Sequence, residues 1–267
     1  MELANVRYLL IDLDGVLYRG QTPLPGAPEL FAFLRQYGIE YLLVTNNSTL
    51  TREAFVERLA GFGINVTANK IMTSAVATAA YLRTLVPPGT KVNIVGEPGL
   101  VQELQRSGFV IAGRDADVVV AGWDKTVTFE KLKVATLAIR DGAMFVGTNP
   151  DKTYPMENDI IPGAGSILAA LVAASDVEPT IVGKPEPIII QRCLEMLGAS
   201  AQETAILGDR LDTDILGGQR AGIGTILVLT GISTHAEAAA WQPRPDLIVD
   251  DLPELLERWH TELDSRG

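Results

Sequence analysis

Short apolar segments alternate along this chain with segments of helical periodicity, and the alternation restricts the possible folds more than any other feature. Apolar runs that predict buried strands lie at residues 9–11, 39–44, 71–74, 92–96, 117–122, 143–147, 180–182, 204–207, 225–229 and 247–249. Helical spacing predicts helices at residues 27–37, 52–59, 75–85, 99–108, 128–140, 162–174, 188–197 and 252–259. The pattern indicates an α/β fold with a doubly wound parallel sheet.

The positions of the acidic residues along the chain indicate two domains. Acidic residues follow an early strand, at residues 12–14, and a late strand, at residues 208–214, with a long α/β segment between them. A length of 267 residues is compatible with one large domain or two modest ones. We therefore expect a core domain formed by residues 1–82 and 179–267, with residues 83–178 inserted as a second α/β domain.

The charge of the chain restricts its partners. The formal net charge is −11 and the isoelectric point is about 4.7, which disfavours binding to nucleic acid or to an anionic membrane. No apolar stretch reaches the roughly 18 residues that a membrane span needs, and no basic and apolar leader precedes the first strand. We expect a cytoplasmic protein that binds neither nucleic acid nor membranes. An anionic ligand would require a local positive charge.

The single cysteine and the two histidines do not form a recognisable catalytic motif. Cys193 lies in an apolar helical segment, where a small buried side chain is favoured, and one cysteine excludes an internal disulfide. His235 and His260 have no serine or cysteine motif beside them, so we expect both at the surface. We interpret Trp123 and the other tryptophans as packing residues, because no basic groove accompanies them.

The first apolar run ends in two aspartates. Asp12 and Asp14 are separated by one residue, and alternate side chains of an extended chain point to the same side. The carboxyl end of a parallel strand is where open α/β sheets bind ligands. Two carboxylates there repel each other unless a cation, a proton or a lysine lies nearby. Asp-x-Asp-Gly is also compatible with an ordinary turn, so this pair alone does not decide between the two interpretations.

Three further strand ends carry residues that suit phosphate and metal chemistry. The hydroxyl and backbone amides of Thr45-Asn46-Asn47 can hold phosphate oxygens, and Lys184 offers a positive charge. Asp209 and Asp214 add carboxylates, which together with Asp12 suit Mg²⁺ as hard oxygen ligands. A carboxylate can also act as a nucleophile toward phosphorus. The residues predict a magnesium and phosphate site, without deciding which of the first two aspartates is the nucleophile.

Four motifs therefore stand at strand ends, in a defined order along the chain. They are Asp12-Leu13-Asp14-Gly15-Val16-Leu17, Thr45-Asn46-Asn47-Ser48, Gly183-Lys184-Pro185 and Gly208-Asp209-Arg210-Leu211-Asp212-Thr213-Asp214. With these motifs the chain resembles the haloacid dehalogenase superfamily of phosphohydrolases over nearly its whole length. The insertion looks like the C2-type cap of the subfamily IIA enzymes, the nitrophenylphosphatase and phosphoglycolate phosphatase type. The resemblance implies a Rossmann-like core with an inserted α/β cap.

The resemblance also implies roles for the acidic residues. Asp12 would attack phosphorus, and Asp14 would act first as a general acid and then as a general base. The Asp12 carboxylate, the Asp14 backbone carbonyl and Asp209 would hold Mg²⁺. Asp214 would orient the residues that bind the metal without binding it itself, and Asp212 would be a solvated residue. The presence of Asp14 favours a phosphatase over a dehalogenase, because the dehalogenases lack this second aspartate.

The remaining motif residues would bind the phosphoryl group. By resemblance, Thr45 and the amides of Asn46 and Asn47 would hold its oxygens. Lys184 would bridge the phosphoryl group and Asp12.

Residues of the inserted cap are expected to choose the substrate. Asn149, Asp151 and Tyr154 follow a predicted strand, and the family places substrate-selecting residues in this loop. A plain turn is the alternative for each of them. Family members often pair through the cap, so a homodimer is one expected state.

The expected activity is Mg²⁺-dependent hydrolysis of a small phosphorylated metabolite through an aspartyl-phosphate. Phosphoglycolate or an aryl phosphate is the first expected substrate, followed by nucleoside monophosphates and sugar phosphates. A phosphomutase of the same superfamily is a related alternative. A signalling receiver module is disfavoured by the inserted domain, and an inactive scaffold that binds a phosphometabolite is disfavoured because every motif position is filled.

Overall fold

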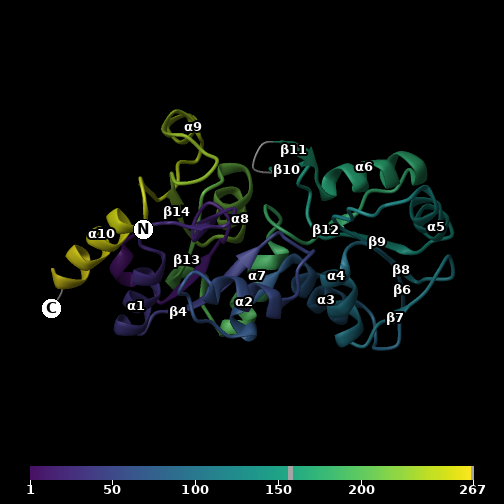
Figure 1. Cartoon of the computed structure of the whole chain (residues 1–267), viewed down its shortest axis with the longest axis horizontal. Coiled ribbons are helices and arrows are strands. Elements are labelled where there is room, and N and C mark those ends of the chain that lie inside the picture. Colours follow the sequence, from purple (N-terminus) through teal and green to yellow (C-terminus); the bar gives the residue numbers. More distant parts are fainter. Residues whose placement is uncertain (156–158, 266–267) are drawn as a thin grey trace. The chain divides into compact units, whose positions relative to one another are not determined.

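A computed structural model describes residues 1–155 and 159–265 of the chain (Figure 1). Its helices and strands form two units. Unit 1 consists of Met1–Thr45, Val56–Ile71 and Ile190–Gly267, and unit 2 consists of Asn46–Phe55 and Met72–Ile189. Each unit contains its own mainly parallel sheet with helices packed against it, as the alternation along the sequence predicts.

The sheet of unit 1 has the order β15-β14-β13-β1-β4-β5. Its strands are β1 (Tyr8–Ile11), β4 (Glu40–Thr45), β5 (Ile71–Thr73), β13 (Thr204–Gly208), β14 (Gly224–Val228) and β15 (Leu247–Val249). Strand β1 pairs in parallel with two neighbours, and its last residue, Ile11, is in register with Leu43 and with Leu207. The carboxyl ends of β1, β4 and β13 therefore lie level at one edge of the sheet.

Helices surround this sheet. Those that lie wholly or mostly in unit 1 are η1 (Leu3–Asn5), α1 (Ala27–Tyr37), α2 (Arg52–Ala60), η2 (Ala68–Lys70), α7 (Ile188–Leu197), η3 (Ala201–Glu203), the π-helical turn η4 (Leu211–Ile215), α8 (Leu216–Ala221), α9 (His235–Ala240) and α10 (Leu252–Asp264). Helices α1 and α10 meet at the fully buried Trp259, whose ring centroid lies 5.2 Å from that of Phe33. A short hairpin of β2 (Tyr18–Arg19) and β3 (Thr22–Pro23) follows β1.

The sheet of unit 2 has the order β12-β9-β8-β6-β7. Its strands are β6 (Lys91–Val95), β7 (Val110–Ile111), β8 (Val118–Ala121), β9 (Met144–Gly147) and β12 (Thr180–Ile181), and all their pairings are parallel. Helices α3 (Ser74–Leu85), α4 (Pro98–Arg106), α5 (Phe129–Arg140) and α6 (Ala164–Ser175) belong to the same unit. Strands β10 (Thr153–Pro155) and β11 (Ile160–Pro162) form an antiparallel pair.

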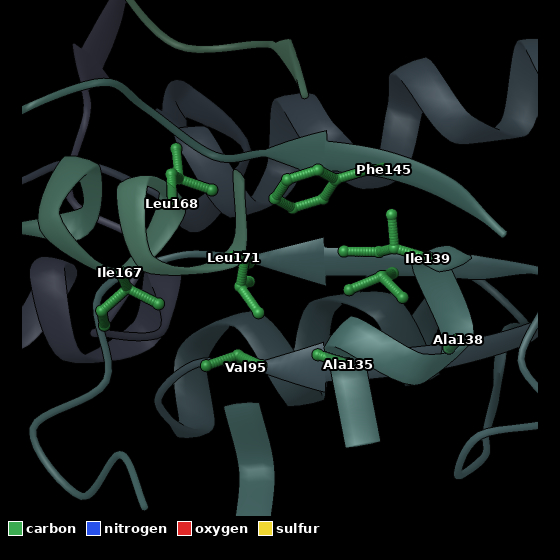
Figure 2. Close-up of a cluster of buried hydrophobic side chains, with 10 residues drawn as sticks. Val95, Ala135, Ala138, Ile139, Phe145, Ile167, Leu168 and Leu171 are labelled. Atoms are coloured by element: carbon green, nitrogen blue, oxygen red, sulfur yellow. The ribbon is translucent and has the colours of Figure 1, made fainter. Parts of the chain in front are cut away.

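The hydrophobic core of unit 2 lies between its sheet and helices α5 and α6. Figure 2 shows Phe145 of β9 gathered with Ile139 of α5 and Leu171 of α6 in this cluster. The small side chains of Ala135 and Ala138 allow α5 to approach the sheet closely, and burial of the larger apolar groups stabilises the packing by about 1.5–3 kcal/mol for each fully buried side chain.

The α/β class and the parallel sheets that the sequence predicts are confirmed. The structure adds short elements that the periodicity did not predict: β2, β3, β7, β10, β11, α8, α9 and the short helical turns η1, η2, η3 and η4. These elements have two to six residues, which is too short for a hydrophobic period to be read. Within the described part of the chain, no helix combines the length and apolar character needed to cross a membrane.

Candidate active site

The two aspartates of the first motif directly follow β1. The amide of Asp12 still donates to Leu207 O at 2.9 Å, so its position is fixed by the sheet. Leu13 between them is fully buried, while Asp12 is buried and Asp14 is half-buried. Gly15 then adopts a φ of 82°, and its amide donates to Tyr18 O at 2.8 Å, which turns the chain away from the strand.

Asp209 follows β13, the strand next to β1, and its carboxylate is held by a later loop. Its Oδ2 accepts a hydrogen bond from the Ile232 amide at 2.8 Å, and its carbonyl accepts one from the Ser233 amide at 3.1 Å. A Cβ atom at Gly231 would lie 1.8 Å from Asp209 Oδ2, and one at Gly15 would lie 2.5 Å from the same oxygen. The carboxylate therefore fits only because both of these neighbours are glycines.

Asp214 lies in the π-helical turn η4 and packs back on β13. Its Oδ2 accepts a hydrogen bond from the Arg210 amide at 3.1 Å. A Cβ atom at Gly208 would lie 2.2 Å from the Asp214 Cβ, so the glycine allows the close approach of the turn. Irregular π-helical turns are frequent at functional sites, and this one places a carboxylate beside a strand end.

Asp12, Asp209 and Asp214 form one cluster, which we call the aspartate cluster. Each offers a carboxylate oxygen, and these oxygens all lie within 4.8 Å of one another. All three residues are buried. Buried carboxylates this close repel one another strongly unless a cation or protons balance them. The donor set therefore fits a hard divalent cation, which prefers carboxylate oxygens.

The second and third motifs meet in unit 2, around the side chain of Asn46. The Asn46 Nδ2 donates to Asp151 Oδ2 at 3.1 Å and to Lys184 O at 2.8 Å. The Asn46 carbonyl accepts from Asn149 Nδ2 at 2.8 Å and from Ser74 Oγ at 2.6 Å. Residues that are far apart in the sequence are thus joined by one hydrogen-bond network.

Lys184 and Asn149 are both buried within this arrangement. The exposed fraction of Lys184 is only 2%, and that of Asn149 is 4%. Both polar atoms of the Asn149 side-chain amide bond to protein atoms. Its Nδ2 donates to the Asn46 carbonyl, and its Oδ1 accepts from the Asp151 amide at 3.2 Å. A lysine buried to this degree requires a compensating charge or hydrogen-bond partner in its surroundings.

The residues that flank Asn46 have separate surroundings. Thr45 is the last residue of β4 and is buried. Asn47 Oδ1 accepts from the Thr49 amide at 2.8 Å, from the Thr49 hydroxyl at 2.9 Å and from the Leu50 amide at 3.3 Å. The Asn47 side chain therefore caps the turn that follows, and its backbone amide is the group that the sequence predicts for phosphate binding.

Several residues outside the motifs take structural positions. Asp212 pairs with Arg210, with Nη2 2.9 Å from Oδ2. His235 is exposed and lies 2.9 Å from Asp250, while His260 Nδ1 lies 2.9 Å from Leu256 O. Cys193 is fully buried. No one of these residues belongs to the aspartate cluster or to the network around the second motif.

Comparison with known proteins is consistent with this arrangement. The sequence profile of the haloacid dehalogenase-like hydrolases matches residues 9–110, and a related HAD-hydrolase-like profile matches residues 181–255. An acid sugar phosphatase of Staphylococcus aureus is 42% identical over 248 residues, which cover 92% of this chain and 95% of that protein.

Solved structures of similar proteins agree in fold. A thermostable NPPase from Geobacillus stearothermophilus, solved as a double mutant, is 40% identical with a TM-score of 0.87 and covers 94% of this chain and 98% of its own. A p-nitrophenyl phosphatase from Archaeoglobus fulgidus is 34% identical with a TM-score of 0.90, with coverage of 94% and 98%.

The fold, the aspartate cluster and these relatives define the class: the chain belongs to the haloacid dehalogenase-like hydrolases. Within that class it is a phosphatase, a hydrolase of phosphoric monoesters.

Proposed function

We propose that this phosphatase uses Mg²⁺ and hydrolyses small phosphomonoesters through an aspartyl-phosphate on Asp12. The observation that carries the proposal is the aspartate cluster, in which buried carboxylates lie within 4.8 Å of one another at the end of the central strand. A bound divalent cation would balance the repulsion between these carboxylates. Mg²⁺ fits because it takes one or two carboxylates and leaves positions for phosphate oxygens.

Asp12 is the proposed nucleophile. One of its carboxylate oxygens forms a bond to phosphorus while the bond from phosphorus to the leaving oxygen breaks. Asp14 donates the proton that the leaving oxygen requires and later removes a proton from water. That water attacks the phosphorus of the aspartyl-phosphate, releases inorganic phosphate and restores Asp12. The half-buried position of Asp14 supports this exchange of protons with solvent.

Three groups would hold the metal: the Asp12 carboxylate, the Asp14 backbone carbonyl and the Asp209 carboxylate. When bound, Mg²⁺ supplies positive charge that balances these carboxylates and the phosphoryl oxygens. Asp214 would orient the site rather than bind phosphate. This role is supported by the hydrogen bond that its carboxylate accepts from the Arg210 amide. The Ile232 amide fixes the rotation of the Asp209 carboxylate in the same way.

Thr45, the amides of Asn46 and Asn47, and Lys184 are the proposed phosphoryl ligands. The link between Asn46 and the Lys184 carbonyl supports a common role for the second and third motifs. Lys184 would also bridge the phosphoryl group and Asp12, so its charge would oppose the repulsion between these two anions.

Residues 83–178 are proposed as the cap that selects the substrate, with Asn149 and Tyr154 as substrate-binding residues. The similar proteins named acid sugar phosphatase and p-nitrophenyl phosphatase support sugar phosphates and aryl phosphates as the first substrates to test. Phosphoglycolate and nucleoside monophosphates complete the panel.

The proposal is tested by measuring phosphate release from this panel with Mg²⁺ or with EDTA. The variants are Asp12→Asn and, as a matched control, Asp212→Asn, which changes an exposed aspartate of the fourth motif. We expect Mg²⁺-dependent release by the wild type and by the control, and none by Asp12→Asn. Trapping with radiolabelled substrate should label the wild type and not Asp12→Asn.

Three outcomes would contradict the proposal. Release that persists in EDTA would exclude the metal, and release by Asp12→Asn would exclude the nucleophile. Transfer of phosphate within the substrate without free phosphate would indicate a mutase.

A further inference from the structure

The loop that follows β14 reaches the ends of two other strands of the unit 1 sheet. In the sheet, β14 lies next to β13, β13 lies next to β1, and all these pairings are parallel. A segment that joins the end of β14 to the end of β1 must therefore cross the end of β13. The distance across is two inter-strand spacings, about 10 Å. Residues 230–233 make this crossing, and we call them the bridging loop.

Thr230 joins the bridging loop to the turn that follows β1. Its Oγ1 donates a hydrogen bond to the Gly15 carbonyl at 2.6 Å. Its own carbonyl accepts a hydrogen bond from the guanidinium of Arg19, in β2. The Gly15 amide is also bonded, because it donates to Tyr18 O at 2.8 Å. Both polar backbone groups of the residue that follows Asp14 are thus held.

The other end of the bridging loop holds the residues that follow β13. The amides of Ile232 and Ser233 donate to the carboxylate and to the carbonyl of Asp209, respectively. Ser233 is buried, and its Oγ accepts a hydrogen bond from the Leu211 amide at 3.0 Å. The bridging loop is therefore bonded to the first motif and to the fourth.

Close packing adds to these hydrogen bonds. A Cβ atom at Gly15 would lie 3.1 Å from Gly231 Cα and 2.5 Å from Asp209 Oδ2. The backbone of the first motif and that of the bridging loop therefore meet with no side chain between them. Closely packed groups transmit small displacements, so a shift of the bridging loop changes both motifs.

The bridging loop is itself fixed on either side. Just before it, the Leu229 amide donates to Val249 O of β15 at 3.0 Å. Just after it, Thr234 forms a capping box with Glu237 at the start of α9. These bonds tie the loop to the sheet and to a helix, so it offers a rigid support for a functional group.

Asp14 needs such a support more than Asp12 does. The Asp12 amide is bonded to β13 and its side chain is buried, whereas Asp14 is only half-buried. The next residue, Gly15, has a φ of 82°, and a glycine is the residue whose backbone has the most freedom. A general acid must lie within hydrogen-bond reach of the leaving oxygen, and a misplacement of about 1 Å can cost a factor of about 100. Bonds from outside the turn are therefore required to keep the acid in place.

We propose that Thr230 is a positioning residue for Asp14. The Thr230 hydroxyl fixes the Gly15 carbonyl, and the Asp14 carboxyl is thereby kept where it can donate its proton to the leaving oxygen. This inference rests on the proposed function, because it concerns the general acid of that reaction. Loss of the hydroxyl lowers the fraction of complexes in which the proton is within reach. The attack by Asp12 is left intact, because its position is fixed by β13.

The test compares two substrates that share a ring and differ in their leaving group, p-nitrophenyl phosphate and phenyl phosphate. Nitrophenolate leaves readily without a proton because the nitro group spreads its charge, whereas the more basic phenolate depends on the acid. The measured quantity is kcat/KM, which covers the steps up to formation of the aspartyl-phosphate. Thr230→Val should lower kcat/KM about tenfold for phenyl phosphate and less than about twofold for p-nitrophenyl phosphate. The ratio of the first value to the second should therefore fall about fivefold.

Two further threonine variants separate positioning from a general loss of stability. Thr230→Ser keeps the hydroxyl and should keep the wild-type ratio. Thr204→Val is the matched control, because Thr204 Oγ1 donates to Ser200 O at 2.7 Å in a bond of the same kind. Thr204 begins β13, so it lies at the end of the strand opposite Asp209. Its variant should keep the wild-type ratio even where thermal unfolding shows that it is destabilised.

Arg19→Gln tests the bridging loop without changing Thr230 itself. Arg19 is exposed, so its substitution leaves the core intact. The variant loses the hydrogen bond to the Thr230 carbonyl. The ratio should fall about twofold, in the same direction as in Thr230→Val. This variant decides the question if Thr230→Val does not fold.

An equal loss for the two substrates in Thr230→Val would overturn the inference and leave Thr230 a structural role alone. An unchanged ratio in both Thr230→Val and Arg19→Gln would overturn it as well. So would a ratio that falls as far in Thr204→Val.

The proposed function is judged separately, with Asp14→Asn. A ratio that falls at least as far in this variant as in Thr230→Val would support the acid and its positioning together. An unchanged ratio in Asp14→Asn would remove Asp14 as the general acid, and the inference with it. Mg²⁺-dependent release and its loss in Asp12→Asn are measured with p-nitrophenyl phosphate, so they do not depend on either result.

Discussion

The side-chain amide of Asn46 donates a hydrogen bond to Asp151 Oδ2 at 3.1 Å, so the loop after β9 holds a residue of the second motif. The same amide group donates to Lys184 O at 2.8 Å. Asp151 therefore influences two proposed phosphoryl-binding segments without any requirement to contact the substrate. We therefore predict that Asp151 positions the proposed site.

We predict that Asp151→Ala lowers kcat/KM about tenfold, since removing a charged partner from a hydrogen bond costs about 1.5–3 kcal/mol. The loss should appear for all substrates, ring-bearing or acyclic. Asp151→Asn keeps an acceptor oxygen and should recover most of the activity, which a purely structural cavity effect would not explain. Steady-state kinetics of both variants would distinguish a positioning role from a purely structural one. The surface variant Asp115→Asn serves as the control.

Gly231→Ala is expected to damage the metal site, because a Cβ atom there would lie 1.8 Å from Asp209 Oδ2. The carboxylate must rotate or the loop must move, and both change the aspartate cluster. We expect phosphate release at limiting Mg²⁺ to fall at least about tenfold, and unfolding stability to fall by about 1–3 kcal/mol, the usual cost of overpacking. Gly113→Ala is the control, since its Cβ would meet only Asp115 at 4.0 Å. Wild-type behaviour of Gly231→Ala would contradict the packing argument.

Metal binding can be measured without turnover. Addition of Mg²⁺ to the wild type should raise the temperature of unfolding, because a ligand that binds the folded state stabilises it. Asp209→Asn removes one charge of the aspartate cluster. The Mg²⁺ concentration needed for a given rise in the unfolding temperature should therefore increase about tenfold. The control Asp212→Asn, whose carboxylate pairs with Arg210, should respond as the wild type does. Equal responses of both variants would exclude Asp209 as a ligand.

The start of helix α9 should lose stability in acid. Hydrogen bonds from the Thr234 amide and hydroxyl lower the pKa of Glu237, which closes a capping box with Thr234. A carboxyl group with a lowered pKa stabilises the folded state above its ordinary pKa, and this contribution is lost as the pH falls through the lowered value. We predict that Glu237→Gln unfolds at a lower temperature than the wild type at pH 7, by about 1–2 °C. The difference should shrink toward pH 3, and a constant difference would refute the assignment.

The long strands and the position of the motifs at their ends could be predicted from the sequence because each leaves a local signal. The run from Leu9 to Ile11 reads as a buried strand, and the spacing of Asp12 and Asp14 follows from the geometry of an extended chain. The level ends of β1 and β13 then bring Asp12 and Asp209 together, as the parallel-sheet argument predicts.

Contacts between residues far apart in the sequence left no local signal. The sequence predicts Trp123 as a packing residue, and it packs on the core of unit 2. Its stack with Tyr154 brings together the segment after β8 and strand β10, which are far apart in the sequence. The bond between Asn46 and Asp151 has the same origin. Asn149 was predicted to bind substrate from the family's pattern, and this stays a prediction, while its amide is seen to contact protein atoms.

The pairing of β1 delays completion of the unit 1 sheet during synthesis of the chain. This strand pairs with β4 on one side and with β13 on the other, and β13 begins only at Thr204. A ribosome that has completed unit 2, which ends at Ile189, has not yet synthesised half of the central sheet of unit 1. The nascent chain must therefore hold the apolar β1 without β13, one of its two partner strands, while the whole of unit 2 is synthesised, which exposes this edge of β1 to chaperones and to aggregation.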